Sequence, residues 1–332
     1  MTDDKMGIEI FSIGAGKLAA RVLNFGATLM ELSFAMPEGQ RPVILNLGSP
    51  EAYLNNPGYL GVIAGRCANR IRGGHCEIDG KSYKLDRNEK DITHLHGGSG
   101  GFSRQYWALV NQSSDAVELR LRSADGDQGY PGNVDATCRY EVVGDTGFRV
   151  TLTATTDATT LVNLAAHGYF NLLPGSSVLD HSIQVEASHY TPVDANLIPT
   201  GQVASVDGSC FDFREATPIG QRRAESPIGF DHNLVLAAAP RPEPTLAATL
   251  TSPTRDLSME LFTTEPGLQF YDGQKLTANS ESKLYRFAGC CLEPQRYPDA
   301  IHHPNFASSI LKPGEVYKQV TEYWFKDKTA AT

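Results

Sequence analysis

The chain has 332 residues, with 29 Lys and Arg against 38 Asp and Glu, which gives a formal net charge of -9. The basic residues form no cluster, so nucleic acid and anionic membrane surfaces are excluded as expected partners. The length allows two modest domains or one large β domain, and no apolar run approaches the length that spans a membrane.

The cysteines indicate a reducing compartment. They form no CxxC pair, and two of them are adjacent, which is awkward geometry for two separate disulfides. Residues 1–5 lack the basic and apolar regions of a secretory signal. We therefore expect a soluble, cytoplasmic protein with reduced thiols. The six cysteines are Cys67, Cys76, Cys138, Cys210, Cys290 and Cys291.

A glycine-rich stretch near the N-terminus, residues 14–19 (GAGKLA), matches a dinucleotide-binding fingerprint. That fingerprint needs a following helix whose N-terminus holds the pyrophosphate, yet residues 24–26 (NFG) interrupt any helix within a few positions. Lys17 is followed by neither Ser nor Thr, so a phosphate-binding P-loop is excluded as well. We expect no nucleotide cofactor.

Two further patterns resemble ion sites. His94 and His96 could share one strand face, and residues 302–303 add two more imidazoles, but no carboxylate or Cys stands in ligand spacing nearby. Residues 125–129 (DGDQG) begin like a calcium loop, but the position of its closing Glu is Ala136. We expect a turn at 125–129 and no metal site.

Alternation of apolar and polar residues recurs along the chain and predicts strands at 117–122, 149–154 and 257–261. Short clusters of Gly, Pro, Asn and Asp separate these runs, and long amphipathic helices are missing. Three prolines at 237–244 predict a surface loop and not a domain linker. The pattern favours an all-β protein, a single domain over residues 1–332 built as a large antiparallel β-sandwich, with residues 326–332 as a frayed tail.

The segment 163–172 (NLAAHGYFNL) separates at strand period into two faces. One face is apolar and is expected to enter the core. The other carries a His, a Tyr and two amides, a set suited to a polar concave site such as a sugar cleft. These four residues are Asn163, His167, Tyr169 and Asn171.

A second segment, 290–299 (CCLEPQRYPD), places Glu293 among apolar neighbours just before a proline-punctuated loop. A half-buried Glu has a raised pKa, and with a His it supplies the two titrating groups needed for acid-base chemistry near neutral pH. The alternative is a Glu held in a salt bridge at the end of a strand.

Taken together, ten segments identify the chain as similar to the aldose 1-epimerase (galactose mutarotase) family over nearly its full length. Each is weak alone, but their order and spacing are specific. Seven of them are NFGAT at 24–28, GRCANRI at 65–71, LHGG at 95–98, DGDQGYPGN at 125–133, TPVD at 191–194, LIPTG at 197–201 and GFDHN at 229–233. The others are the 163–172 segment, LQFY at 268–271, and the Glu293 segment with PNF at 304–306.

The resemblance implies a galactose mutarotase-like supersandwich, no cofactor, and interconversion of the α and β anomers of a free aldose, hexose or pentose. Glu293 matches the base that takes the proton of the anomeric hydroxyl, and His167 matches the acid that protonates the ring oxygen. Tyr169 and Phe102 offer apolar faces to the sugar ring. The positions that match sugar-binding residues are Asn69, Arg70, His96, Tyr169, Asp231 and Gln269.

The chain departs from the family pattern beside the two catalytic positions. It has Ala165 and Ala166 where a polar pair is common, Gly168 where Ser is common, Pro294 in place of Thr, and a different stretch at 301–303. We expect these departures to affect the choice of sugar more than the reaction.

Two alternatives stay open. An epimerase of a phosphorylated sugar would need a cationic cluster, for which Arg66, Arg70 and Arg72 are the local candidates. A non-catalytic sugar-binding protein of the same fold would be free to lose Glu293 or His167, and both are present. We expect a small-molecule aldose as partner, and a monomer or homodimer.

Overall fold

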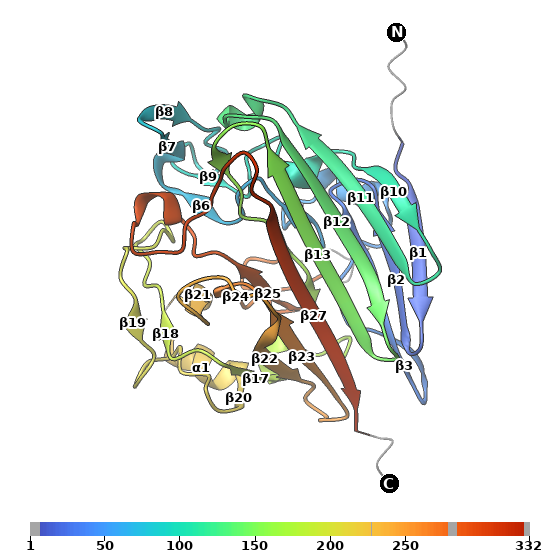
Figure 1. Ribbon diagram of the computed structural model, residues 1–332. Helices are drawn as coiled ribbons and strands as arrows, with labels where there is room; N and C mark the ends of the chain where they lie inside the picture. Colours follow the sequence, from blue (N-terminus) through green and yellow to red (C-terminus); the bar gives the residue numbers. More distant parts are fainter. Residues whose placement is uncertain (1–6, 227, 278–283, 329–332) are drawn as a thin grey trace.

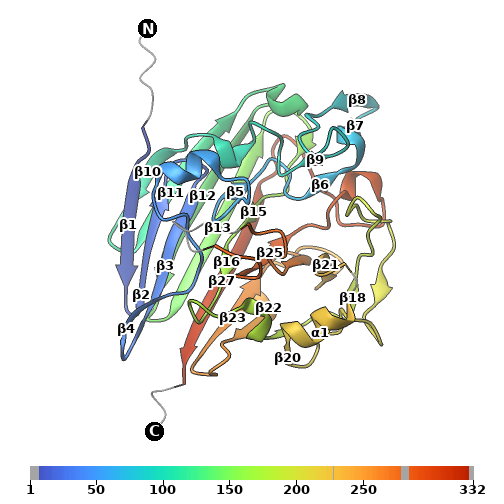
Figure 2. The ribbon, with the colours of Figure 1, turned by 180° about the vertical axis from the view of Figure 1, so that it is seen from behind.

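The largest sheet dominates the computed structural model, which describes residues 7–226, 228–277 and 284–328 (Figures 1 and 2). It has nine strands, and each strand pairs antiparallel with its neighbours. In sheet order the strands are β10 (Ala108–Gln112), β11 (Ala116–Ser123), β12 (Val134–Val143), β13 (Gly147–Thr156), β27 (Tyr317–Asp327), β23 (Leu257–Thr263), β22 (Thr245–Thr251), β17 (Ser182–Val185) and β20 (Thr217–Pro218).

Two further antiparallel sheets complete the sandwich. The four-stranded sheet consists of β1 (Ile10–Ala15), β2 (Leu18–Leu23), β3 (Thr28–Met36) and β4 (Gly39–Pro42). The six-stranded sheet consists, in order, of β16 (Tyr169–Phe170), β25 (Cys290–Gln295), β24 (Gly267–Tyr271), β21 (Asp231–Val235), β18 (His189–Tyr190) and β19 (Ala204–Ser205).

Short ribbons and turns connect these sheets. The two-stranded ribbons are β5 (Ile63–Ala64) with β15 (Ala165–Ala166), β6 (Arg70–Ile71) with β9 (His94–Leu95), β7 (His75–Ile78) with β8 (Lys81–Lys84), and β14 (Thr160–Leu161) with β26 (Ile310–Leu311). The 3-10 helices are η1 (Glu51–Asn55), η2 (Arg72–Gly74), η3 (Phe102–Arg104), η4 (Asp127–Gly129), η5 (Val178–Asp180) and η6 (Ala300–His302).

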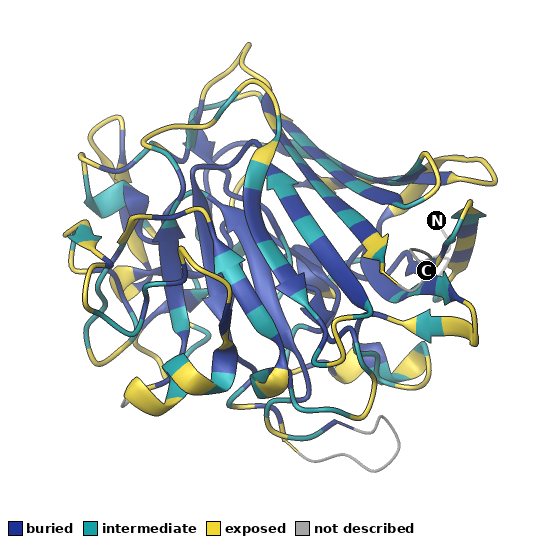
Figure 3. Ribbon diagram, turned by 90° about the horizontal axis from the view of Figure 1, so that it is seen from below, coloured by how far each residue is buried: buried dark blue, intermediate teal, exposed yellow. Residues whose placement is uncertain are grey.

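The core lies between the nine-stranded sheet and the other two sheets. Residues of β12 alternate strictly between buried and half-buried positions, as a strand with one face in a core must (Figure 3). On β27, Phe325 packs 5.6 Å from Phe34 of β3, and Tyr323 packs 5.0 Å from Phe170 of β16. One strand of the large sheet therefore contacts both smaller sheets, and the all-β antiparallel sandwich predicted from the sequence is confirmed.

The expected strands at 117–122, 149–154 and 257–261 are present as β11, β13 and β23. One cluster of buried apolar side chains includes residues from Phe11 to Phe325, which favours the single-domain prediction. In the described residues the α-helix is α1 (Ile219–Glu225), with seven residues, and no helix there is long and apolar enough to cross a membrane. Residues 237–244 form an exposed connection between β21 and β22, as predicted.

Three local predictions meet a clear outcome. The glycine-rich stretch at 14–19 is the turn of the β1–β2 hairpin, so no helix N-terminus exists there to hold a pyrophosphate. Residues 125–129 form a turn that contains η4. The predicted frayed tail begins too early, because Lys326 and Asp327 belong to β27. Residues 329–332 of the predicted tail and the N-terminal residues 1–5 lie outside the described residues.

The prediction of one continuous strand over residues 163–172 is wrong. The structure has two short strands, β15 and β16, separated by His167 and Gly168. The backbone leaves one partner for another at this point, because Ala165 pairs with β5 whereas Tyr169 pairs with β25. The change of partner places His167 between two sheets.

Candidate active site

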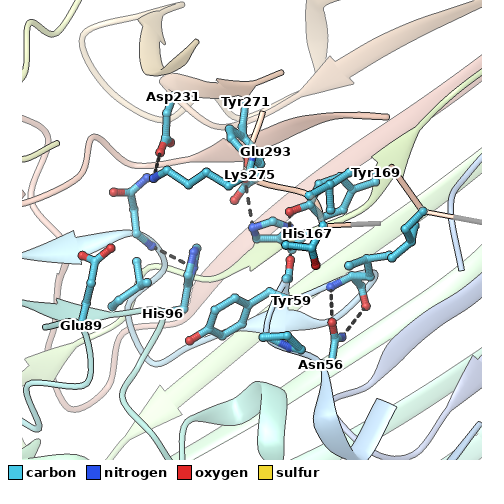
Figure 4. A pocket seen from close by; sticks show the side chains of 18 of the residues that line it. Asn56, Tyr59, Glu89, His96, His167, Tyr169, Asp231, Tyr271, Lys275 and Glu293 are labelled. Atoms are coloured by element: carbon cyan, nitrogen blue, oxygen red, sulfur yellow. Dashed lines mark hydrogen bonds and ion pairs between the residues drawn. The ribbon is translucent and has the colours of Figure 1, made fainter. Parts of the chain in front are cut away.

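A cavity of about 480 Å³ lies over one face of the six-stranded sheet (Figure 4). The strands β16, β25 and β21 supply its floor, and the β6–β9 ribbon and the loop of residues 55–60 form its sides. Seven of the eight residues predicted for the site line this cavity. They are Glu293, His167, Asn69, Arg70, His96, Tyr169 and Asp231.

Strand register explains why residues distant in the sequence meet here. Tyr169 lies opposite Cys291, Cys291 opposite Tyr271, and Tyr271 opposite Asp231, so these side chains share one row across four strands. Glu293 lies two positions beyond Cys291 on β25 and therefore points to the same face. The strand thus places a thiol and a carboxyl group on one face; Glu293 lines the cavity, whereas Cys291 is buried beneath it.

Glu293 and His167 form a close buried pair. The Nε2 atom of His167 lies 3.7 Å from Oε1 of Glu293, and the side chains are 6% and 3% exposed. Burial lowers the pKa of His167 to about 4, because the charged imidazolium is poorly solvated there. Burial, assisted by the negative charge of Asp231, raises the pKa of Glu293 well above its usual value. The alternative of a Glu held in a salt bridge at the end of a strand does not fit, because Glu293 is buried inside β25 and its neighbour His167, with a pKa of about 4, is not a cation near neutral pH.

The other ring nitrogen of His167 faces a thiol. Nδ1 lies 3.6 Å from Sγ of Cys291, so the imidazole stands between the thiol on one side and Glu293 on the other. The backbone of His167 is fixed by hydrogen bonds from its N–H to the carbonyl of Val62 and from the N–H of Gly61 to its own carbonyl. These contacts hold the ring in position over the cavity floor.

Arg70 is the centre of a buried ionic cluster on the opposite wall. Its guanidinium donates two hydrogen bonds to Glu89, with Nε to Oε2 at 2.7 Å and Nη2 to Oε1 at 2.8 Å. Nη1 lies 3.8 Å from Oδ2 of Asp231, and Nζ of Lys275 lies 3.9 Å from the same oxygen. The cluster fixes both charged donors and charged acceptors, the groups that recognise sugar hydroxyls through charge-assisted hydrogen bonds.

His96 presents a defined tautomer to the cavity. Its Nδ1 accepts a hydrogen bond from the backbone N–H of Asn69 at 3.2 Å, so the proton of the neutral ring resides on Nε2. Burial lowers the pKa of His96 well below its usual value, so the ring is neutral at pH 7. The next residue, Gly97, has φ 89°, and a Cβ there would lie 1.6 Å from the carbonyl oxygen of Gly65. A glycine is needed for this turn to pack so closely and bring His96 to Asn69.

Gln269 lies directly opposite Glu293 in the sheet but does not reach the cavity surface. Its Nε2 donates a 2.8 Å hydrogen bond to Oδ1 of Asp231, and the residue is 3% exposed. It is not among the residues that line the cavity. The geometry thus gives Gln269 a contact through which it orients Asp231.

Several side chains expected at the site instead support the fold. Asn163 forms hydrogen bonds with the backbone N–H and carbonyl of Arg296 through its two amide atoms. Asn171 donates to the carbonyls of Ser176 and Ala288 and accepts from the N–H of Leu173. Phe102 packs edge-on against Trp107 in the core. His94 is fully buried, with Nδ1 close to a backbone carbonyl and Nε2 2.6 Å from the hydroxyl of Tyr130, so it does not share a site with His96.

The four departures expected to lie beside the sugar do not line the cavity. Pro294 points to the face of β25 opposite Glu293, and its carbonyl accepts a hydrogen bond from Gln319. A Cβ added to Gly168 would approach the ring of Phe170. Ala165 packs in a small apolar cluster, and Ala166 packs against the main core. They were expected to adjoin the sugar, but none of these four residues lines the cavity. Strand alternation turns Pro294 away, whereas Ala165 is covered by Ala64 and Ala68.

Sequence reasoning missed several residues of the cavity. Glu89 precedes β9 in a loop and carries no motif, so nothing in its surroundings indicated a contact with Arg70. Tyr59 stacks at 4.6 Å on His96 from a turn with φ 55°. Cys291 does not line the cavity, but its thiol contacts His167; it could have been found, because it precedes Glu293 by two residues and a strand places both on one face.

Comparison with known proteins agrees with this geometry. The sequence profile described as "Aldose 1-epimerase" matches residues 9–324. The galactose mutarotase of Bos taurus is 37% identical over 331 residues, covering 97% of this chain and 95% of the relative. The aldose 1-epimerase of Escherichia coli (strain K12) is 36% identical over 323 residues, covering 93% of this chain and 92% of the relative.

Solved structures are similar in fold over the whole chain. A GalM/aldose epimerase homologue from C. elegans has a TM-score of 0.89 at 26% identity, covering 97% of this chain and 99% of that one. A galactose 1-epimerase from Lactobacillus acidophilus NCFM has a TM-score of 0.85 at 29% identity, covering 98% and 97%. The fold is the β-sandwich of the galactose mutarotase-like enzymes, which are sugar isomerases. The chain belongs to the aldose 1-epimerase family.

Proposed function

We propose that this protein interconverts the α and β anomers of a free aldose by acid-base ring opening and closure. The observation that carries the proposal is the buried pair of Glu293 and His167, whose Oε1 and Nε2 atoms are 3.7 Å apart in the cavity. The anomeric hydroxyl oxygen and the ring oxygen of a pyranose are bonded to the same carbon. A base and an acid that lie close together can therefore reach both oxygens of one sugar at hydrogen-bond distance.

In the proposed reaction Glu293 takes the proton of the anomeric hydroxyl while His167 gives a proton to the ring oxygen. The bond between the anomeric carbon and the ring oxygen breaks, and the open aldehyde forms. Rotation about the adjacent carbon-carbon bond turns the other face of the carbonyl toward the hydroxyl. Closure then runs both proton transfers in reverse, so the protein is regenerated and no cofactor is consumed.

The electrostatics of the pair suit a reaction that moves one proton back and forth. Burial lowers the pKa of His167 and raises that of Glu293, so over a wide pH range the two groups together hold one mobile proton. The pKa shifts favour this proton on Glu293, whereas the proposed roles use the arrangement with the proton on His167 and an ionised Glu293, so the proton passes from Glu293 to His167 before the ring opens. Gaining a second proton or losing the first removes one of these roles.

The surrounding residues favour a neutral sugar over a phosphorylated one. Arg66 is buried away from the cavity, where it bonds Ser123 and four backbone carbonyls. Arg70 is already paired with Glu89, and Arg72 with Asp194 and Asp299. A phosphate group needs several available cationic donors, which these pairings withhold. Asn69, Asp231 and His96 are positioned to hold hydroxyl groups, and Tyr169 to present a ring face.

Polarimetry tests the proposal directly. Chelator-treated protein added to fresh α-galactose, α-glucose or α-xylose should accelerate the decay of optical rotation to equilibrium at catalytic concentrations. A protein that binds sugar by calorimetry but leaves the decay unchanged would instead be a sugar-binding member of the family. Loss of activity on chelation with return on adding zinc would overturn the metal-free mechanism.

The remaining proposals concern the setting of the protein. A reducing, cytoplasmic location is supported by the six cysteines, all of which carry free thiols. We propose a monomer or a homodimer, which sedimentation measurements would separate.

A further inference from the structure

Three side chains at the floor of the cavity form a candidate soft-metal site, of which His167 and Glu293 line the cavity and Cys291 lies buried behind them. His167, Cys291 and Glu293 each direct one ligand-type atom to the same place, and these atoms lie within 4.8 Å of one another. Among the described residues, this is the only group of three or more His, Cys, Asp or Glu side chains whose ligand atoms lie this close together. All three residues are buried, at 5%, 0% and 2% exposure.

The separations fit the size of a zinc ion. With Zn–S about 2.3 Å and Zn–N about 2.0 Å, two ligands of a tetrahedral ion lie roughly 3.5 Å apart. Sγ of Cys291 is 3.6 Å from His167 Nδ1, and Oε1 of Glu293 is 3.7 Å from His167 Nε2. Because these contacts use the two opposite nitrogens, the ring must turn to present one of them to a shared ion. The single atoms that the three side chains can offer to one ion lie within 4.8 Å of one another, so metal binding requires them to move closer, to about 3.5 Å.

The polar and charged groups around the three residues are also compatible with a bound cation. Oε2 of Glu293 is buried and has no hydrogen-bond partner, which is the state of an acceptor that still needs one. The nearest guanidinium, that of Arg70, is neutralised by Glu89 and Asp231. Three protein ligands with an open fourth position facing a cavity is the arrangement in which Zn²⁺ retains a water or another small ligand.

We propose that the active site binds one Zn²⁺ or Cd²⁺ ion through Cys291, His167 and Glu293, and that this ion inhibits by excluding the sugar. Binding forms bonds from the metal to sulfur, nitrogen and oxygen, and it releases the protons of the thiol and carboxyl groups to solvent. The thiolate selects soft ions, so Mg²⁺ and Ca²⁺ bind poorly. The inhibitory part of the proposal rests on the proposed function, whereas the binding part does not.

Cys290 provides a matched control. It adjoins Cys291 in β25 but pairs with Phe170 and belongs to the main core, whereas Cys291 pairs with Tyr169 on the cavity side. Both thiols are buried, so a difference between Cys290→Ser and Cys291→Ser reports the face of the strand and not the number of cysteines.

The test uses untagged full-length protein freed of metal by chelation and dialysis. Titration with Cd²⁺ should give the ultraviolet thiolate-to-metal charge-transfer band at one ion per chain, and excess galactose should abolish it. In Cys291→Ser the band should be lost and the metal affinity should fall at least tenfold, about the least expected for loss of a ligand. In Cys290→Ser both should stay close to those of the wild type.

Polarimetry supplies the second readout. Zn²⁺ should inhibit wild-type protein competitively with sugar, chelator should restore full activity, and each variant is compared with its own metal-free rate. Equal sensitivity of Cys291→Ser and the wild type would overturn the proposed site, and a Cd²⁺ band that sugar does not displace would overturn inhibition by exclusion of the sugar. A Cd²⁺ band at Cys291 in a protein without mutarotase activity would overturn the proposed function and leave the metal site standing.

Discussion

The Nε2 atom of His167 lies 3.7 Å from Oε1 of Glu293, in a pair that is almost fully enclosed by protein. The two residues are 126 positions apart in the sequence and reach one another because β16 pairs with β25. The pair combines an imidazole whose pKa is lowered with a carboxyl whose pKa is raised. Each shift favours the neutral form, and both come from the same burial.

The first prediction concerns pH. The folded pKa of His167 is about 4, so a second proton enters the pair only near that pH, and activity falls on the acid side there. The raised pKa of Glu293 means that the last proton leaves the pair well above the usual carboxyl range, which sets the alkaline limb. The profile of kcat/KM against pH should therefore be a broad bell with full activity at intermediate pH. A steady increase through pH 4 with no alkaline limb would contradict a shared proton.

The second prediction concerns Glu89. Glu89→Gln removes a half-buried carboxylate that accepts two hydrogen bonds from Arg70 and leaves Asp231 as the carboxylate beside the guanidinium, so the guanidinium is held less firmly. We expect KM to rise about tenfold, as for loss of one charge-assisted contact, with a smaller change in kcat. The exposed Glu77, changed to Gln, is the control. A loss confined to kcat would assign Glu89 to the chemical step.

The third prediction concerns the family departures. Pro294→Thr restores the residue common in relatives, but the side chain points away from the cavity. We expect the ratio of kcat/KM for galactose and glucose to stay within about twofold, since uniform effects on stability do not discriminate between sugars. Steady-state polarimetry with both sugars measures the ratio. A tenfold shift would show that the residue reaches the sugar through the strand.

The fourth prediction concerns stability in acid. Nε2 of the buried His181 accepts a 3.0 Å hydrogen bond from the N–H of Leu172, and burial lowers the pKa of His181 to about 4. Between the unfolded pKa of about 6.5 and the folded value, the unfolded state binds a proton that the folded state does not. The free energy of unfolding therefore decreases as pH falls through this window and levels off below it.

Urea denaturation at several pH values measures the effect. His181→Asn retains an acceptor but does not titrate, so the slope between pH 6 and 5 should be smaller by about 1.4 kcal/mol per pH unit at most. His75→Asn, at an exposed position, serves as the control. Identical slopes in the wild type and His181→Asn would contradict the assignment.

The sequence predicted the strands whose burial alternates, because period-two patterning states directly which face enters a core. β11, β13 and β23 are of this kind. The prediction from the sequence was wrong at 163–172. The chain changes its pairing partner between Ala165 and Tyr169, and this change does not alter the alternation of apolar and polar residues. Asn163 and Asn171 look like site residues in a list of polar side chains, but both satisfy backbone groups.

The site was predicted best where a residue type is chemically unusual for its surroundings. Glu293 stands among apolar neighbours, and a carboxyl group in such surroundings has a shifted pKa, which is typical of functional sites. Glu89 was missed because a Glu in a polar loop is ordinary, and only the fold brings it to Arg70. The position of Gln269 behind Asp231 also follows from register, which alternation alone does not give.

The central claim is that Glu293 and His167 exchange protons with the sugar. Glu293→Gln and His167→Asn retain approximate size and hydrogen bonding but cannot carry out that exchange. Each should lose on the order of 10²–10⁴ in kcat while calorimetry still detects sugar binding, and the double variant should lose far less than the product of the two. If Glu293→Gln retained more than about a tenth of wild-type turnover, far above the loss expected for a general base, Glu293 would not be the base.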